Sequence, residues 1–142
     1  YEHALDQYYG FSAVEMLEKK DYKKAEEYFK KAEDLRLKYP DELTYGLYRR
    51  IIKKLTDKKI KVICMQYPVR SINSLKNELK NEKYYNEVEF VSNENAFKEL
   101  LKKKSFNAVF TDRFAGDFGH CRKEGCQLIA KNVADALGKL IK

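Results

Sequence analysis

The sequence lacks any long apolar segment. Its longest unbroken apolar run, Val62 to Met65, is far shorter than the roughly 20 residues that a membrane-spanning helix needs. An initiator Met and a basic, apolar signal segment are also absent from the first residues, so we expect any targeting peptide to lie upstream or to have been removed. We therefore expect no membrane span, and the sequence does not indicate a compartment.

The sequence contains few cysteines, and their number is odd. The three cysteines are Cys64, Cys121 and Cys126, and Cys64 lies inside the apolar run, so no disulfide framework is indicated. His120 with Cys121 and Cys126 would offer nitrogen and sulfur ligands that suit zinc. The sequence offers no obvious fourth metal ligand beside these three, and it has no paired Cys-x-x-Cys elements. We therefore predict neither a metal site nor a cofactor.

The charge excess is modest. Twenty-nine Lys and Arg stand against 22 Asp and Glu, for a net charge of +7. Many of the lysines, as in residues 19–31, lie between carboxylates on predicted helix faces, where they form weak pairs one turn apart. This distribution indicates a solvated surface, and nucleic acid is not an expected partner. The hydrophobic content of 44% is enough for a modest core.

The N-terminal part of the chain carries three helical patterns. Apolar residues recur at steps of three and four in segments 4–17, 22–39 and 43–55. The turn between the first two segments is short, and Pro40 ends the second. The pattern predicts an antiparallel helical hairpin followed by a third helix.

The rest of the chain alternates between strand and helix patterns. The expected order is strand 60–67, helix 71–80, strand 88–91, helix 93–103, a short extended piece at 106–110 and a final helix 124–141. Alternation of this kind is typical of an α/β fold with parallel strands and a ligand crevice beyond their carboxyl ends.

The residues most suggestive of chemistry precede the last predicted helix. Asp117 and His120 lie among glycines in a predicted loop. A structural interpretation is also open, in which Asp117 caps the following helix and His120 bonds a nearby carbonyl. Asp112 is a second candidate acid, but its distance of eight residues from His120 favours a capping role. Arg113 is expected to pair with Asp112.

This stretch resembles a known family. Asp117-x-x-His120 followed by Gly125, Ile129 and Ala130 is similar to the last conserved block of SGNH/GDSL hydrolases. The resemblance implies that Asp117 orients the imidazole and that His120 accepts the proton of a serine hydroxyl. It also implies the later half of a flavodoxin-like SGNH sheet and an ester-bearing small molecule, glycan or lipid as substrate.

Other segments extend the resemblance. Segments 60–68 and 88–93 look like the strands that precede this block in relatives containing tetratricopeptide repeats. Asp21 to Ala25, with Phe29 and Ala32, is similar to the second helix of such a repeat, although an ordinary hairpin fits equally well. The expected division is a helical, tetratricopeptide-like segment 1–57, packed on an SGNH-like α/β part 58–142.

The departures from the family concern the nucleophile. No Gly-Asp-Ser motif occurs, and we expect each serine to lie at the surface or at a cap: Ser12, Ser71, Ser74, Ser92 and Ser105. The chain is therefore predicted to be a fragment of a serine esterase or deacylase that supplies Asp117 and His120 and is inactive alone. The alternative is a non-catalytic module that binds a protein through the helical hairpin.

Overall fold

The computed structural model describes residues 2–114 and 116–140. Its first part has the three predicted helices, α1 (Glu2–Glu18), α2 (Tyr22–Lys38) and α3 (Glu42–Asp57). The carboxylate of Asp21 accepts a hydrogen bond from the backbone N–H of Lys24 at 3.1 Å, and that of Asp41 accepts one from Thr44 at 3.2 Å. These two aspartates satisfy backbone donors that the first turn of a helix leaves unpaired, and so fix where α2 and α3 begin.

The second part adds two parallel strands and further helices. In chain order these elements are β1 (Val62–Met65), α4 (Asn73–Leu79), a 3-10 helix η1 (Tyr85–Glu87), β2 (Val88–Val91), α5 (Glu94–Lys103), α6 (Phe106–Val109) and α7 (Lys123–Leu140). Val62 lies opposite Val88 and Met65 opposite Val91. The chain thus combines helices with a parallel sheet, but that sheet has only two strands in the described residues, and no flavodoxin-like sheet is seen.

The segment 106–110 differs from the expected extended piece. Phe106–Val109 forms one helical turn, closed by a 2.8 Å hydrogen bond from the N–H of Phe110 to the carbonyl of Phe106. The turn places the buried side chains of Phe106 and Val109 on one side, three residues apart. A short run of mixed residues carries too little periodicity to separate such a turn from a strand.

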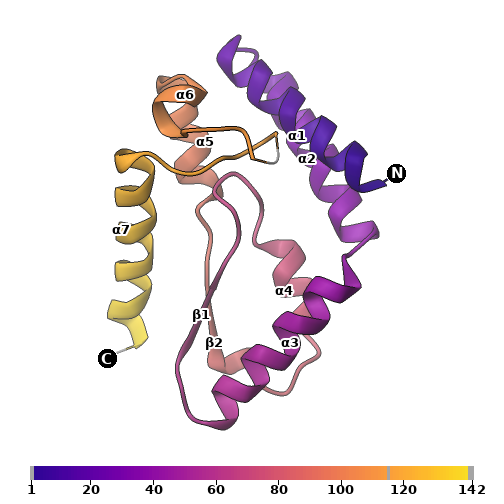
Figure 1. The fold of residues 1–142 in the computed structure, drawn as a ribbon, viewed down its shortest axis with the longest axis vertical. Helices are drawn as coiled ribbons and strands as arrows, with labels where there is room; N and C mark the ends of the chain where they lie inside the picture. Colours follow the sequence, from indigo (N-terminus) through magenta and orange to yellow (C-terminus); the bar gives the residue numbers. More distant parts are fainter. Residues whose placement is uncertain (1, 115, 141–142) are drawn as a thin grey trace.

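The strands run through the centre of the molecule, with α7 on one side and α3 and α4 on the other (Figure 1). The hairpin of α1 and α2 does not pack on the sheet. It contacts α5 and α4 instead. None of the helices, over the part of the chain described, is long and apolar enough to span a bilayer.

Two hydrophobic clusters make up the core. One joins the hairpin to α5 and α6, and the other joins α3 and α4 to the strands. Each cluster therefore contains residues from both sides of the predicted boundary at residue 57. The division into segments 1–57 and 58–142 stays a prediction.

The loop between α6 and α7 extends to the side of α1 and then returns (Figure 1). Gly10 permits this approach, because a Cβ atom built on it would lie 2.8 Å from Cβ and 2.9 Å from Cγ of Asp117. Real Cβ atoms do not come so close to carbon atoms. Gly46, in α3, has no neighbouring atom within 4 Å of such a Cβ.

We predict opposite effects of alanine at these two glycines. Gly10→Ala should lower the free energy of unfolding by about 1–3 kcal/mol, because the methyl group overpacks the contact with Asp117. Gly46→Ala should raise it by about 0.5–1 kcal/mol, since alanine favours a helix interior over glycine. Urea denaturation followed by circular dichroism measures both, and a stabilising Gly10→Ala would contradict the close packing.

Candidate active site

His120 lies beside Asp112 because the chain folds back on itself at this point. Phe110 and Cys121 form an antiparallel bridge, and the N–H of Thr111 donates to the carbonyl of His120 at 2.8 Å. Gly119 is needed at the crossing, since a Cβ there would lie 1.7 Å from the carbonyl oxygen of Asp112. The bridge thus brings together two residues that are eight positions apart.

The two side chains form a hydrogen-bonded pair. His120 Nδ1 lies 2.6 Å from Asp112 Oδ2, and the backbone N–H of His120 donates to Asp112 Oδ1 at 3.0 Å. This backbone hydrogen bond, and next the bond from the imidazole, lower the pKa of Asp112 from its ordinary value. The ionised carboxylate accepts a hydrogen bond from the Nδ1–H group, so the lone pair lies on Nε2, where it can act as a base.

His120 of this pair borders a cavity of about 480 Å³ at the carboxyl ends of the two strands. Most of its wall is aromatic or aliphatic, and its lining residues include Met65, Tyr67, Phe114, Phe118, His120 and Ile129. The imidazole is largely solvent-exposed, with 73% of its side-chain surface accessible. An imidazole base with a fixed tautomer at the edge of an apolar cavity is an arrangement suited to proton transfer on a bound ligand.

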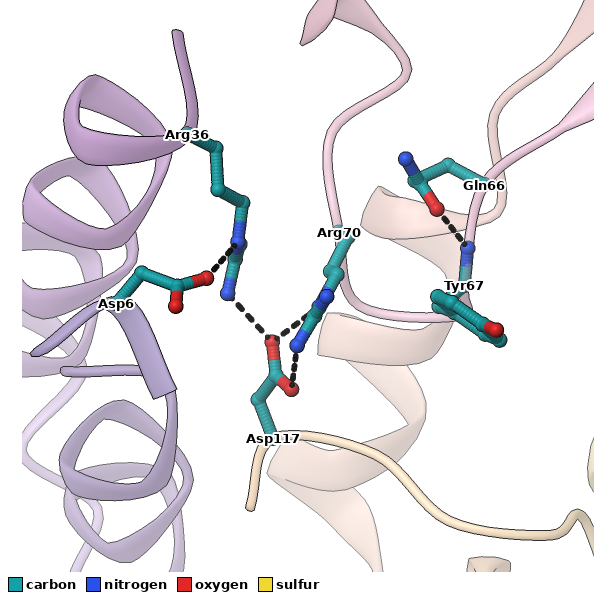
Figure 2. Close-up of polar contacts among 6 residues, drawn as sticks. All are labelled: Asp6, Arg36, Gln66, Tyr67, Arg70 and Asp117. Carbon is teal, nitrogen blue, oxygen red and sulfur yellow. Dashed lines mark hydrogen bonds and ion pairs between the residues drawn. The ribbon is translucent and has the colours of Figure 1, made fainter. Parts of the chain in front are cut away.

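Asp117 does not pair with His120, contrary to the sequence-based expectation. Its buried carboxylate instead accepts two hydrogen bonds from Arg70, Nε to Oδ2 at 2.9 Å and Nη2 to Oδ1 at 3.0 Å. Arg36 Nη2 donates to the same Oδ2 at 3.0 Å, and Arg36 Nε donates to Asp6 Oδ2 at 2.7 Å. Figure 2 shows Arg36 between the two aspartates and Arg70 facing Asp117.

This network binds four separate segments of the chain to one another. Asp6 belongs to α1, Arg36 to α2, Arg70 to the loop after β1, and Asp117 to the loop before α7. Burial of the Arg70 guanidinium acts to lower its pKa, but the hydrogen bonds and charge of Asp117 act the other way and leave that pKa above the ordinary value. The role of Asp117 in this geometry is structural.

An aromatic stack links the network to the cavity. The ring of Phe118, next to Asp117, stacks on that of Tyr67 with centroids 4.1 Å apart, and the guanidinium of Arg70 lies 5.0 Å from the Phe118 ring. Phe114, in turn, contacts the His120 ring edge-on at 5.8 Å. The position of the imidazole therefore depends on side chains held by the buried charges.

The remaining sequence-based candidates are not brought together as a site. No three His, Cys, Asp or Glu side chains within residues 2–114 and 116–140 form a group that could hold a metal ion, and Cys121 and Cys126 are free thiols. Arg113 pairs with Glu18 at 3.3 Å rather than with Asp112. No serine lines the cavity.

Three serines are less exposed than predicted. Ser12, Ser71 and Ser74 are buried, whereas Ser92 and Ser105 are exposed as expected. Ser71 also caps locally, because its hydroxyl oxygen accepts the N–H of Asn73 at 3.2 Å. Burial keeps the hydroxyl groups of Ser12, Ser71 and Ser74 away from ligands, and neither Ser92 nor Ser105 lines the cavity.

The sequence interpretation also missed residues that shape the cavity. Asn93 lies two residues after the end of β2 and is 1% exposed. Its Oδ1 accepts a hydrogen bond from Asn132 of α7 at 2.8 Å. A polar residue at the carboxyl end of a predicted parallel strand was the available signal. Nothing local in the sequence indicated that Arg36 and Arg70 would meet Asp117.

Comparison with known proteins identifies no relative: no protein-family model, no curated protein and no solved structure matches the chain. The resemblance to SGNH/GDSL hydrolases and to a tetratricopeptide repeat stays a prediction.

We predict that Asp117→Asn destabilises the fold strongly. Loss of the carboxylate charge leaves the largely buried guanidinium of Arg70 without its ion-pair partner, and leaves Arg36 with Asp6 alone. Breaking a buried ion pair typically costs about 3–5 kcal/mol in the free energy of unfolding. Asp34→Asn is the control, because the exposed pair of Asp34 with Lys30 contributes about 0–1 kcal/mol. Urea denaturation compares the two variants, and equal effects would contradict a structural role for Asp117.

Cys121 lines the cavity but is a poor nucleophile at neutral pH. Burial, and then the charge of Cys126, raise the pKa of its thiol to about 11. We expect iodoacetamide to alkylate Cys121 slowly at pH 8, and the rate to rise about tenfold per pH unit up to the pKa, because only the thiolate reacts. Mass spectrometry of the labelled peptide measures the alkylation rate of Cys121 at each pH, with free glutathione as the reference thiol. An alkylation rate that is already constant above pH 8 would contradict the raised pKa.

Proposed function

We propose that this chain supplies the acid and base of an ester hydrolase, with Asp112 and His120 as the pair. The observation that carries the proposal is the 2.6 Å contact between His120 Nδ1 and Asp112 Oδ2 at the border of the cavity. The earlier assignment of Asp117 as the acid is replaced, since Asp117 is enclosed by Arg36 and Arg70.

In the proposed reaction, His120 Nε2 takes the proton from a serine hydroxyl as its oxygen attacks the ester carbonyl. The imidazolium then gives that proton to the departing alcohol, and water releases the acyl group through the same two steps. Asp112 holds the imidazole tautomer and stabilises the imidazolium by its negative charge. The lowered pKa of Asp112 supports this role, because the carboxylate stays ionised at neutral pH.

The serine hydroxyl is proposed to come from polypeptide outside residues 1–142. This part of the proposal rests on the cavity lining, which holds no serine and a Cys121 thiol that is protonated at neutral pH. The apolar wall formed by Met65, Phe114 and Ile129 fits the acyl part of a small ester, glycan ester or lipid better than a charged group.

The test is hydrolysis of p-nitrophenyl acetate by the longest natural translation product that contains this chain. We predict that His120→Ala and Asp112→Asn each lower kcat by about 10²–10⁴-fold, because proton transfer then lacks its base or the correct tautomer. His3→Ala, which removes the other histidine, should leave kcat unchanged.

Activity that is insensitive to both His120→Ala and Asp112→Asn would reject the proposal. That result would favour the second candidate, a non-catalytic module that binds a protein through α1 and α2. One observation supports this candidate: Tyr8 and Phe11 of α1 border, together with Phe114, a further cavity of about 370 Å³, and all three side chains are exposed.

A further inference from the structure

The outer edge of β1 is open. β1 pairs only with β2, and no other described residue makes a hydrogen bond to the backbone of Val62–Met65. Alternate residues of a parallel strand direct their N–H and C=O groups to opposite sides, so half of these groups in β1 face away from β2. Parallel strands are normally buried within larger sheets, which makes an isolated pair unusual.

The neighbouring helix α3 carries an exposed apolar stripe. Leu43, Leu47 and Ile51 recur one turn apart with exposed fractions of 73%, 47% and 55%. The opposite side of α3 is occupied, since Ile52 is buried against β1 and α4. A helix that packs one face in the core exposes a polar face to water, so this second apolar stripe indicates a missing contact.

The stripe and the open edge adjoin each other. Tyr48 lies between the core side of α3 and the stripe, and it lines the cavity together with Met65 at the end of β1. Arg49, on the other flank of the helix, pairs with Glu78 of α4 at 3.2 Å. The stripe is therefore on the flank of α3 away from α4, next to Tyr48, and Tyr48 reaches the end of β1 at the cavity.

Cations surround this surface. Arg49 and Lys53 of α3 pair with carboxylates. Five other cations of α3 and of the turn before β1 are exposed and make no ion pair with another described residue: Arg50, Lys54, Lys58, Lys59 and Lys61. A second copy of the chain would bring the same cations and a net charge of +7 to the interface. Charge complementarity therefore favours a partner with acidic residues.

We infer that the outer edge of β1 and the stripe of Leu43, Leu47 and Ile51 form one docking surface for an additional β-strand. The occupant is an extended apolar segment with acidic flanks, contributed by polypeptide other than residues 1–142. Its backbone completes the hydrogen bonds of β1, its side chains cover the stripe on α3, and its carboxylates face the cations. The inference is independent of ester hydrolysis, although the strand would end beside the cavity.

Photo-crosslinking identifies the occupant directly. The longest natural translation product containing the chain is produced in its host cell with p-benzoylphenylalanine in place of Ile51, or in place of Lys23, an exposed residue of α2, as control. We expect the probe at position 51 to capture an apolar segment flanked by Asp or Glu from outside residues 1–142. Capture of residues 1–142 of a second copy, or no capture above the Lys23 control, would overturn the inference.

Hydrogen exchange gives a second, independent measurement on the same full-length product. The double variant Leu47→Glu and Ile51→Glu replaces two of the three apolar residues of the stripe, both at exposed positions outside the core, so we expect the fold to be retained. We expect the outward-facing amides of β1 to exchange at least about tenfold faster in the variant, because the docked strand is lost. Leu37→Glu, at an exposed position of α2, is the matched control, and equal exchange in the three proteins would overturn the inference.

Discussion

The buried carboxylate of Asp117 is the constraint on which the rest of the structure depends. Two guanidinium groups, of Arg36 and Arg70, donate to it, and Arg36 is neutralised further by Asp6. A carboxylate removed from water is tolerated only when charges and hydrogen bonds of this kind replace its hydration. Arg36 belongs to α2 and is tied to α1 by Asp6, and Arg70 belongs to the loop after β1, so the network fixes these three segments relative to the loop that carries Asp117.

The position of this network explains how two separate hydrophobic clusters form one molecule. The first cluster lies around the hairpin and the second around the strands. Arg36 projects from the hairpin and Arg70 from the loop that leaves the sheet, and both reach the same carboxylate (Figure 2). Apolar packing alone is non-directional. The bidentate geometry of Arg70 on Asp117 adds a specific orientation that packing would not provide.

Local structure could largely be predicted from the sequence, whereas the candidate site could be predicted only in part. Strand 88–91 was predicted with its observed bounds, because β-branched and aromatic residues there lie between clear helical patterns. The resemblance to the last SGNH/GDSL block favoured Asp117 as the partner of His120. The bridge between Phe110 and Cys121 selects Asp112 instead. Such a bridge joins residues far apart in sequence and leaves no periodic signal.

Asp112 and Asp117 differ in burial, and the difference suits the two carboxylates to different roles. Asp117 is enclosed by cations and packed against Gly10, so neither a substrate nor a reacting proton reaches it. Asp112 is about half-exposed, and among the described residues its side-chain partner is the imidazole of His120, whose Nε2 makes no hydrogen bond with them. A buried charge needs fixed partners that offset the cost of its desolvation, but a proton-transfer pair must keep one atom accessible to its ligand. The exposed pair is therefore the functional candidate, and the buried aspartate is the reason that the loop holds it at the cavity.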